Sequence, residues 1–277
     1  MKKLVLLFCL FLILPANAQN YNIVCPSESL SIIEKESVIN KITGLNFASK
    51  KIVEVAIQKV LNDEFYKSNI NADLDIFNIK RLKNGEFKAL SLKTENLRYR
   101  ALSMSDFHAQ TVCSYNKVVQ QNKKVYFPID LPLKFEGTIT NLDIQNVLNS
   151  EEFQRELKKI SILKTPKVVI NNGFLDFTIP IKNPFSSKPL NVKFRADIAV
   201  ENNKIVLRNI TFNSKSNIIN NDVLSPLLGT INPIAYEIDA ANGKFCKLLI
   251  TKAIIYGNEI KTNGVLVINK NIGEGNE

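Results

Sequence analysis

The stretch that decides the fold is Leu-Asn-Val-Lys-Phe-Arg-Ala-Asp-Ile-Ala-Val, residues 190–200. Apolar side chains take every second position, and Asn191, Lys193, Arg195 and Asp197 stand between them. Because side chains alternate faces along a strand, this pattern predicts a strand with one apolar and one polar face. At roughly 3.3 Å per residue it would extend about 36 Å, whereas strands usually have ~5–6 residues. Helices alone, or helices together with a lipid, must cover so long an apolar face.

Further alternating segments, joined by turns, fill most of the chain. Tight turns are predicted at residues 83–85, 171–173, 201–204, 242–243 and 257–258, which contain Asn, Gly or both. Strands are predicted at 87–99, 102–115, 174–181, 244–256 and 259–269, with a meander that begins at Val168, and a change of face near Arg208 and Asn209 indicates a bulge. Pro128 and Pro132 should push the segment 125–135 to a sheet edge or bend it.

Helical patterns separate these groups of strands. A weak one covers residues 30–42, and a stronger one follows Asn46, which we expect to cap about sixteen helical residues. Thr140 and Asp143 have the spacing of a helix-capping pair, and Ser150 should start a further helix that reaches about Lys159. A short helix is predicted at 222–228. The class predicted is α+β: a long, curved antiparallel sheet of meanders packed on a long N-terminal helix and shorter helices.

The first eighteen residues have the pattern of a secretory signal peptide. Lys2 and Lys3 precede an apolar run, and Ala16-Asn17-Ala18 is a small-x-small cleavage site. We therefore expect export to the periplasm or cell envelope of a bacterium. The predicted organisation is a signal peptide at 1–18, a lead-in at 19–45, a single α+β domain at 46–270 and a flexible tail at 271–277.

Three cysteines follow the predicted cleavage site: Cys25, Cys113 and Cys246. An exported chain can form one disulfide among them and keep one thiol, and the spacing leaves the pairing open. The formal net charge is +10. Because no block of Lys and Arg dominates, we expect no nucleic-acid partner, although a basic exterior favours peripheral contact with an anionic membrane surface.

Catalysis would have to use His108, the only histidine in the chain. It lies within a predicted strand, no Gly-x-Ser-x-Gly motif is present, and we interpret it as a partly exposed structural residue. Scattered cysteines and one histidine do not make a zinc site, and the glycine-rich motifs that bind nucleotides are absent. The sequence therefore predicts no catalytic residues, no metal and no cofactor.

Apolar surface is what remains, since strands this long and one-sided exceed what three modest helices can cover. A groove that holds acyl chains would complete the burial at ~0.8 kcal/mol per CH₂. As its lipid-contact residues we predict Val53, Ala56, Ile57 and Val60 from the helix, with Val192, Phe194, Ala196 and Ile198 from the sheet.

Two further segments carry a resemblance to a known family. Residues 82–87, Leu-Lys-Asn-Gly-Glu-Phe, lead into alternating strands, and residues 139–148, Ile-Thr-Asn-Leu-Asp-Ile-Gln-Asn-Val-Leu, precede the hairpins. Over about residues 36 to 270 the chain resembles the LmeA-like family of bacterial periplasmic phospholipid-binding proteins. The resemblance implies a TULIP-like fold, a curved sheet wrapped on a long helix with lipid between them. It also implies binding of phospholipid or another acyl lipid, and a role in envelope lipid upkeep without catalysis.

Two other functions stay open on the sequence alone. One is an envelope structural or assembly protein that binds another protein through a strand edge. The other is an exported hydrolase, whose carboxylates can come from any part of a chain.

Overall fold

The computed structural model describes residues 23, 25–26, 45–66, 68–99, 102–121, 124–183, 188–212, 232–234 and 245–270. Within these ranges the chain is α+β and every strand pairing is antiparallel, as predicted. The predicted signal peptide, the helices at 30–42 and 222–228, the turn at 242–243 and the C-terminal tail lie outside the described residues.

The larger of two open sheets has six strands in the order β1-β3-β6-β10-β16-β15. The chain leaves this sheet after β10, forms the smaller sheet, and returns to add β16 beside β10 and β15 at the outside. The strands are β1 (Asn71–Asp75), β3 (Ala89–Thr94), β6 (Asp106–Thr111), β10 (Leu131–Thr140), β15 (Cys246–Tyr256) and β16 (Glu259–Ile268).

The smaller sheet is a four-stranded meander and contains the stretch quoted first. Its strands are β11 (Lys167–Asn171), β12 (Phe174–Ile181), β13 (Leu190–Glu201) and β14 (Lys204–Phe212). The turn predicted at 171–173 has Gly173 at φ +84°, and the turn at 201–204 has Asn202 and Asn203 at φ 50° and 62°. These positive angles are those that hairpin turns require. The predicted bulge is also confirmed, because the β13–β14 register shifts between Arg195 and Asp197, where Asn209 has φ 50°.

Among the described residues, the single long sheet expected from the sequence is thus two sheets, accompanied by three two-stranded ribbons. The ribbons pair β2 (Glu86–Phe87) with β7 (Asn116–Lys117), β4 (Leu97–Tyr99) with β5 (Leu102–Met104), and β8 (Val119–Gln121) with β9 (Lys124–Tyr126).

The continuous strands predicted at 87–99 and 102–115 were wrong, since each is broken. Asn96 forms a turn in the first, donating its backbone N–H to the Thr94 hydroxyl at 3.2 Å. Ser105 breaks the second, because its N–H donates to the Thr138 carbonyl at 2.9 Å and its hydroxyl donates to Asp143 at 2.6 Å. Local polar contacts of this kind compete with a regular ladder.

Pro132 was expected either to place its strand at an edge or to bend the chain. The bend is present, since β9 and β10 are separate strands. The edge is not, because β10 lies inside the six-stranded sheet between β6 and β16. Pro132 stands near the start of β10, one residue before the register with β6 begins at Leu133. Its carbonyl accepts from the Val112 N–H at 3.0 Å, so at this end of the strand the proline keeps its acceptor and lacks only the donor.

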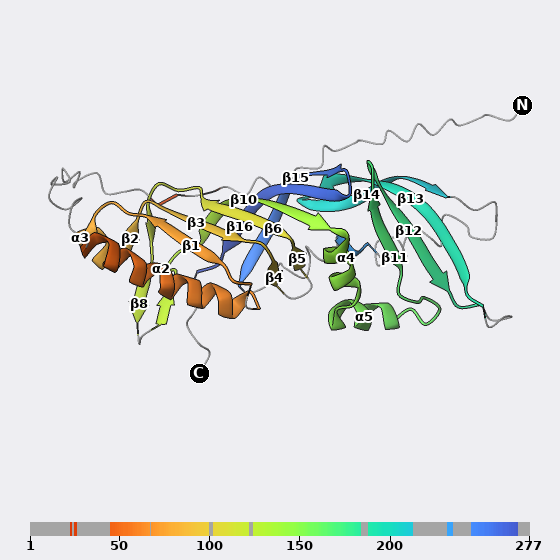
Figure 1. Cartoon of the computed structure of the whole chain (residues 1–277), viewed down its shortest axis with the longest axis horizontal. Helices are drawn as coiled ribbons and strands as arrows, with labels where there is room; N and C mark the ends of the chain where they lie inside the picture. The colour runs from red at the N-terminus through yellow and green to blue at the C-terminus, as the bar shows by residue number, and fades with distance from the viewer. Residues whose placement is uncertain are drawn as a thin grey trace, which may run out of the picture.

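The two sheets lie side by side along the long axis of the molecule (Figure 1). Helix α2 (Leu45–Glu64) runs beneath the six-stranded sheet, with α3 (Ile79–Lys83) at its outer end. Helices α4 (Asn141–Leu148) and α5 (Glu151–Lys158) lie where the sheets meet. The Ile250 N–H donates to the carbonyl of Asn203 at 3.1 Å, which joins the β13–β14 turn to β15.

Helix α2 begins at Leu45, so Asn46 lies inside the helix and not at its cap as predicted. The periodicity of apolar residues identifies the body of a helix better than its ends. The caps of the later helices are confirmed. Thr140 and Asp143 form a reciprocal capping box on α4, and the Ser150 hydroxyl accepts from the Phe153 N–H on α5.

Asp143 also joins α4 to both neighbouring strands. Its buried carboxylate accepts from the hydroxyls of Ser103 and Ser105 at 2.6 Å each, and from the N–H of Thr140 at 2.8 Å. A buried carboxylate is stable in such a place only when its oxygens are hydrogen-bonded. The capping residue of α4 therefore fixes the helix on the sheet.

A row of polar side chains on α2, spaced four residues apart, covers the outer edge of β1. An uncovered strand edge exposes N–H and C=O groups that pair with other chains, and these side chains occupy them. The contacts are Lys50 Nζ to Asp73 at 2.8 Å, the Leu74 N–H to Glu54 at 3.0 Å, Gln58 to Asn71 at 3.2 Å and the Ile70 N–H to Asn62 at 2.7 Å.

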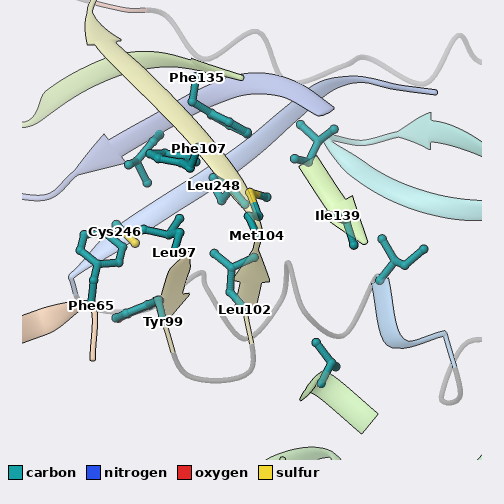
Figure 2. Packing of buried hydrophobic residues seen from close by; sticks show 14 of the residues in the cluster. Phe65, Leu97, Tyr99, Leu102, Met104, Phe107, Phe135, Ile139, Cys246 and Leu248 are labelled. Atoms are coloured by element: carbon teal, nitrogen blue, oxygen red, sulfur yellow. The ribbon is translucent and has the colours of Figure 1, made fainter. Parts of the chain in front are cut away.

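A continuous hydrophobic core runs through both sheets and is filled by the protein's own side chains. Phe107 stacks on Phe135 at a centroid distance of 5.5 Å, and Phe177 stacks on Phe194 at 4.6 Å. Figure 2 shows part of this core, where Phe65 lies near Tyr99 and the side chain of Cys246.

The structure pairs Cys25 with Cys113 across 88 residues of sequence, with 5.4 Å between their Cα atoms. Cys246 takes no part in this disulfide and its side chain is buried at the start of β15. The disulfide attaches the segment before α2 to the end of the strand region that contains β6.

Candidate functional site

A groove of about 550 Å³ lies beside α2, at the end of the molecule where α3 and the ribbon strands β7 and β8 meet the helix. Three segments form it, and each contributes consecutive or nearly consecutive residues. They are Ile52, Val53 and Ala56 from α2, then Leu82, Lys83, Asn84 and Gly85, and finally Lys117, Val118 and Val119.

The wall opposite α2 depends on a close backbone approach at Gly85. Gly85 has φ +78°, donates its N–H to the Leu82 carbonyl at 2.8 Å and accepts from the Val118 N–H at 2.8 Å. A Cβ atom on Gly85 would lie 1.7 Å from the Val118 carbonyl oxygen. Only glycine fits both the positive φ and this approach, so Gly85 holds the two segments of the wall together.

Helix α3, which leads into that wall, is held by its N-cap and by contacts of Arg81. The Asn78 side chain caps it by accepting from the Arg81 N–H at 2.9 Å. Arg81 in turn contacts Glu86 at 2.8 Å and stacks over the Phe77 ring at 4.0 Å. Burial and the neighbouring Glu86 carboxylate raise the pKa of Tyr115, which lies on the other side of Arg81.

The α2 side of the groove is apolar and open to solvent. Ile57 and Leu61, one face of the helix, are buried in the core, whereas Val53 and Ala56 are only half-buried and Ile52 is 70% exposed. Ile52 therefore places exposed apolar surface at the rim of the groove.

Two lysines give the groove a positive charge. Lys83 is the last residue of α3 and Lys117 is the last residue of β7, and both line the groove. Within the described residues neither ammonium group forms an ion pair. The groove thus combines an apolar side with uncompensated positive charge, an arrangement that matches an amphiphile with an anionic group.

The structure brings only some of the predicted lipid-contact residues to this groove. Val53 and Ala56 line it, Ile57 is in the core, and Val60 is half-buried against the core. The predicted sheet residues lie in the four-stranded sheet, at the other end of the molecule from α2 (Figure 1). Val192, Phe194 and Ala196 are buried in the protein's own core, and Ile198 is half-buried.

The helix and strand sets therefore do not face each other across one groove. Sequence reasoning missed Lys83, Lys117 and Val118, which complete the actual one. The Leu82–Gly85 segment was predicted as a turn that leads into a strand, but not as part of a groove. Its Asn-Gly pair was the available signal, because a positive-φ glycine marks a place where backbones approach closely.

His108 lies on the outer face of the six-stranded sheet, as an exposed residue, beside a second hollow of about 410 Å³. Its Nε2 atom is 3.1 Å from the Ser91 hydroxyl, the spacing of a nucleophile and its base. A working pair also needs a carboxylate to orient the imidazole, and His108 bonds to none within the described ranges.

Comparisons with protein-family models, with curated proteins and with solved structures found no match. Across the part of the chain that the structure describes, no helix combines the length and apolarity needed to span a bilayer. Over the same part, no cluster of three His, Cys, Asp or Glu side chains is placed to hold a metal ion.

Proposed function

We propose that this protein is a non-catalytic phospholipid-binding protein of the bacterial cell envelope that binds or transfers lipid through the groove beside α2. An acyl chain lies along Ile52, Val53 and Ala56, and the phosphate lies near Lys83 and Lys117. The single observation that carries the proposal is this pairing of an exposed apolar helix side with two lysines that have no ion-pair partner among the described residues.

The size and chemistry of the groove support this ligand class. Its volume of about 550 Å³ falls within the range of roughly 300–1,000 Å³ typical of small-molecule sites. Each CH₂ group transferred from water to the apolar side contributes ~0.8 kcal/mol, so a partly buried chain of several carbons supplies useful affinity. The lysines favour an anionic phosphate by charge.

Two further parts of the proposal concern location and family. The disulfide between Cys25 and Cys113 supports export, because disulfides persist in oxidising compartments such as the periplasm. Membership of the LmeA-like family and a TULIP-like architecture remain part of the proposal. They are supported by the fact that the Leu82–Gly85 segment, which carries the resemblance, lines the groove.

The alternative function, binding of another protein through a strand edge, is less well supported by the same structure. One outer strand of each sheet already has its edge covered by a helix. The Leu74 N–H of β1 donates to Glu54 of α2, and the Ile170 N–H of β11 donates to the side chain of Asn141 at 2.7 Å.

The test is native mass spectrometry of the mature protein after incubation with phosphatidylglycerol. Val53→Glu places a charge in the groove and should abolish the lipid-bound mass. Val60→Glu is the matched control, because it is a half-buried valine of the same helix that does not line the groove. Equal occupancy in the two folded variants would refute the site, and no occupancy in the wild-type protein would refute the function.

Native mass spectrometry with two different phospholipids tests whether the lysines bind the phosphate. Reversing charge at both Lys83 and Lys117 should remove the preference for phosphatidylglycerol over phosphatidylcholine while binding of the acyl chain persists. Lys193→Glu, at an exposed position of β13, should leave the preference unchanged. A preference that survives the double reversal would show that the phosphate lies elsewhere.

A further inference from the structure

The outer face of α2 carries two exposed apolar side chains beside the groove. Ile52 is 70% exposed and Val55 is 51% exposed, and they lie three residues apart on one face of the helix. Ile52 also lines the groove, so the exposed apolar face is continuous with the proposed lipid site.

Basic residues flank this apolar pair. Lys51 and Lys59 stand one turn before and one turn after Val55, on the same side of the helix. Lys59 is exposed and forms no ion pair within the described ranges, and Lys51 contacts Glu54 at 3.6 Å while remaining largely exposed. Lys83 and Lys117 add positive charge across the groove. The acidic residues Asp63 and Glu64 lie at the far end of α2.

We propose that this face of α2, defined by Lys51, Ile52, Val55 and Lys59, docks the protein on an anionic lipid bilayer. Helices that lie on membranes present apolar side chains to the acyl boundary and Lys or Arg to the headgroups. In this orientation Ile52 and Val55 enter the interface, and the groove opens towards the lipid layer. Docking goes beyond the proposed function, because it does not require an occupied groove.

Charge and size both select a bilayer as the occupant. The lysines around the face complement anionic headgroups, and each contributes about fivefold to partitioning near a negatively charged surface. Two apolar side chains are few for a stable protein partner, which usually buries about 20–30 residues on each side. A second copy of this chain would also set like-charged lysines against one another.

The experiment is flotation of the mature protein with vesicles of phosphatidylcholine, alone or mixed with phosphatidylglycerol. The wild-type protein should float with the mixed vesicles, less so at high salt, and weakly with phosphatidylcholine alone. Val55→Ser together with Ile52→Ser should weaken binding about tenfold by removing apolar area, and Lys59→Gln about fivefold. Ile254→Ser with Tyr256→Ser is the matched control, because these side chains are 46% and 73% exposed but lie on β15 outside the groove.

Val55→Ser alone separates docking from lipid binding, since Val55 does not line the groove. This variant should lose vesicle binding but keep wild-type affinity for a short-chain phosphatidylglycerol monomer in solution. Vesicle binding that is unchanged by the Ile52 and Val55 substitutions would overturn the docking proposal. If the substitutions instead abolish self-association in sedimentation and leave vesicle binding intact, the docking proposal would be overturned, and the face would be one that binds a second copy of the chain. Failure of monomer binding in the wild-type protein would instead refute the proposed function.

Discussion

Replacing Gly85 by alanine tests the wall of the groove, and replacing Gly173 by alanine provides its control. Both glycines have a positive φ, +78° at Gly85 and +84° at Gly173. They differ in their surroundings. A Cβ atom at Gly173 would meet nothing within 4 Å, whereas one at Gly85 would lie 1.7 Å from the Val118 carbonyl oxygen. The comparison of the two variants therefore separates the effect of the close approach to Val118 from the effect of the positive φ.

The expected loss of stability has two parts at Gly85 and one at Gly173. A left-handed conformation costs an alanine roughly 1–2 kcal/mol at either position. At Gly85 the overlap also forces the two segments of the wall apart, a form of overpacking that typically costs 1–3 kcal/mol. We expect Gly85→Ala to lower the free energy of unfolding by about 2–5 kcal/mol and Gly173→Ala by about 1–2 kcal/mol, by the same principles.

Urea unfolding followed by circular dichroism measures both values. Phosphatidylglycerol binding by the folded fraction measures the effect on the groove, which should be reduced in Gly85→Ala and unchanged in Gly173→Ala. Equal stability of the two variants, within about 0.5 kcal/mol, would show that the 1.7 Å contact does not constrain the protein, and the account of the wall would then fail.

Two further predictions concern the polar row of α2. Glu54→Ala leaves the buried Leu74 N–H without its acceptor, so it should lower the free energy of unfolding by about 1–3 kcal/mol and speed hydrogen exchange at that amide. Glu54→Gln keeps an acceptor and should lower the stability less. Equal losses of stability and equal exchange rates in the two variants would contradict this role of Glu54. The hydrogen bond and charge of Lys50 hold the pKa of Asp73 below the ordinary value of an aspartate, so Lys50→Met should raise that pKa, as an NMR titration of the carboxyl group can show. Because the folded-state pKa of Asp73 is lowered, the stabilisation by the Lys50–Asp73 pair is present at neutral pH and is lost as the pH falls through that pKa. The free energies of unfolding of the wild-type and Lys50→Met proteins should therefore converge in acid. A difference that persists in acid would contradict the stabilising role of this pair.

Local features of the fold could be predicted from the sequence because local chemistry determines them. The Asn202-Asn203 turn, the bulge at Asn209 and the caps at Thr140 and Ser150 each depend on a few adjacent residues. Residues that favour positive φ or accept from helix N–H groups are recognisable without knowledge of their neighbours in space.

The division into two sheets could not be predicted in the same way. It depends on β16 inserting beside β10, a pairing in which Leu131 faces Ile268, about half the chain away in sequence. Alternation of apolar residues shows which face of a strand is buried but not which strand pairs with it. The same limit explains the strand at 102–115, which is broken by contacts from Ser105 to residues more than thirty positions away.

The candidate site was predictable only on its helical side. The half-apolar pattern of α2 identified Val53 and Ala56, although it could not separate groove residues from core residues such as Ile57. The opposite wall comes from Leu82–Gly85 and Val118, whose proximity is created by tertiary structure. The apolar face of β13 suggested a guest, but Val192, Phe194 and Ala196 on that face are buried in the protein's own core.

The most direct test of the lipid site is photo-crosslinking with a phosphatidylglycerol that carries a diazirine on its acyl chain, followed by peptide mass spectrometry. The account predicts crosslinks to Ile52, Val53 and Ala56 and to residues 117–119, which line the groove, and their loss on competition with unlabelled lipid. Crosslinks concentrated on β13 at residues 192–198, or labelling that does not respond to competition, would contradict it.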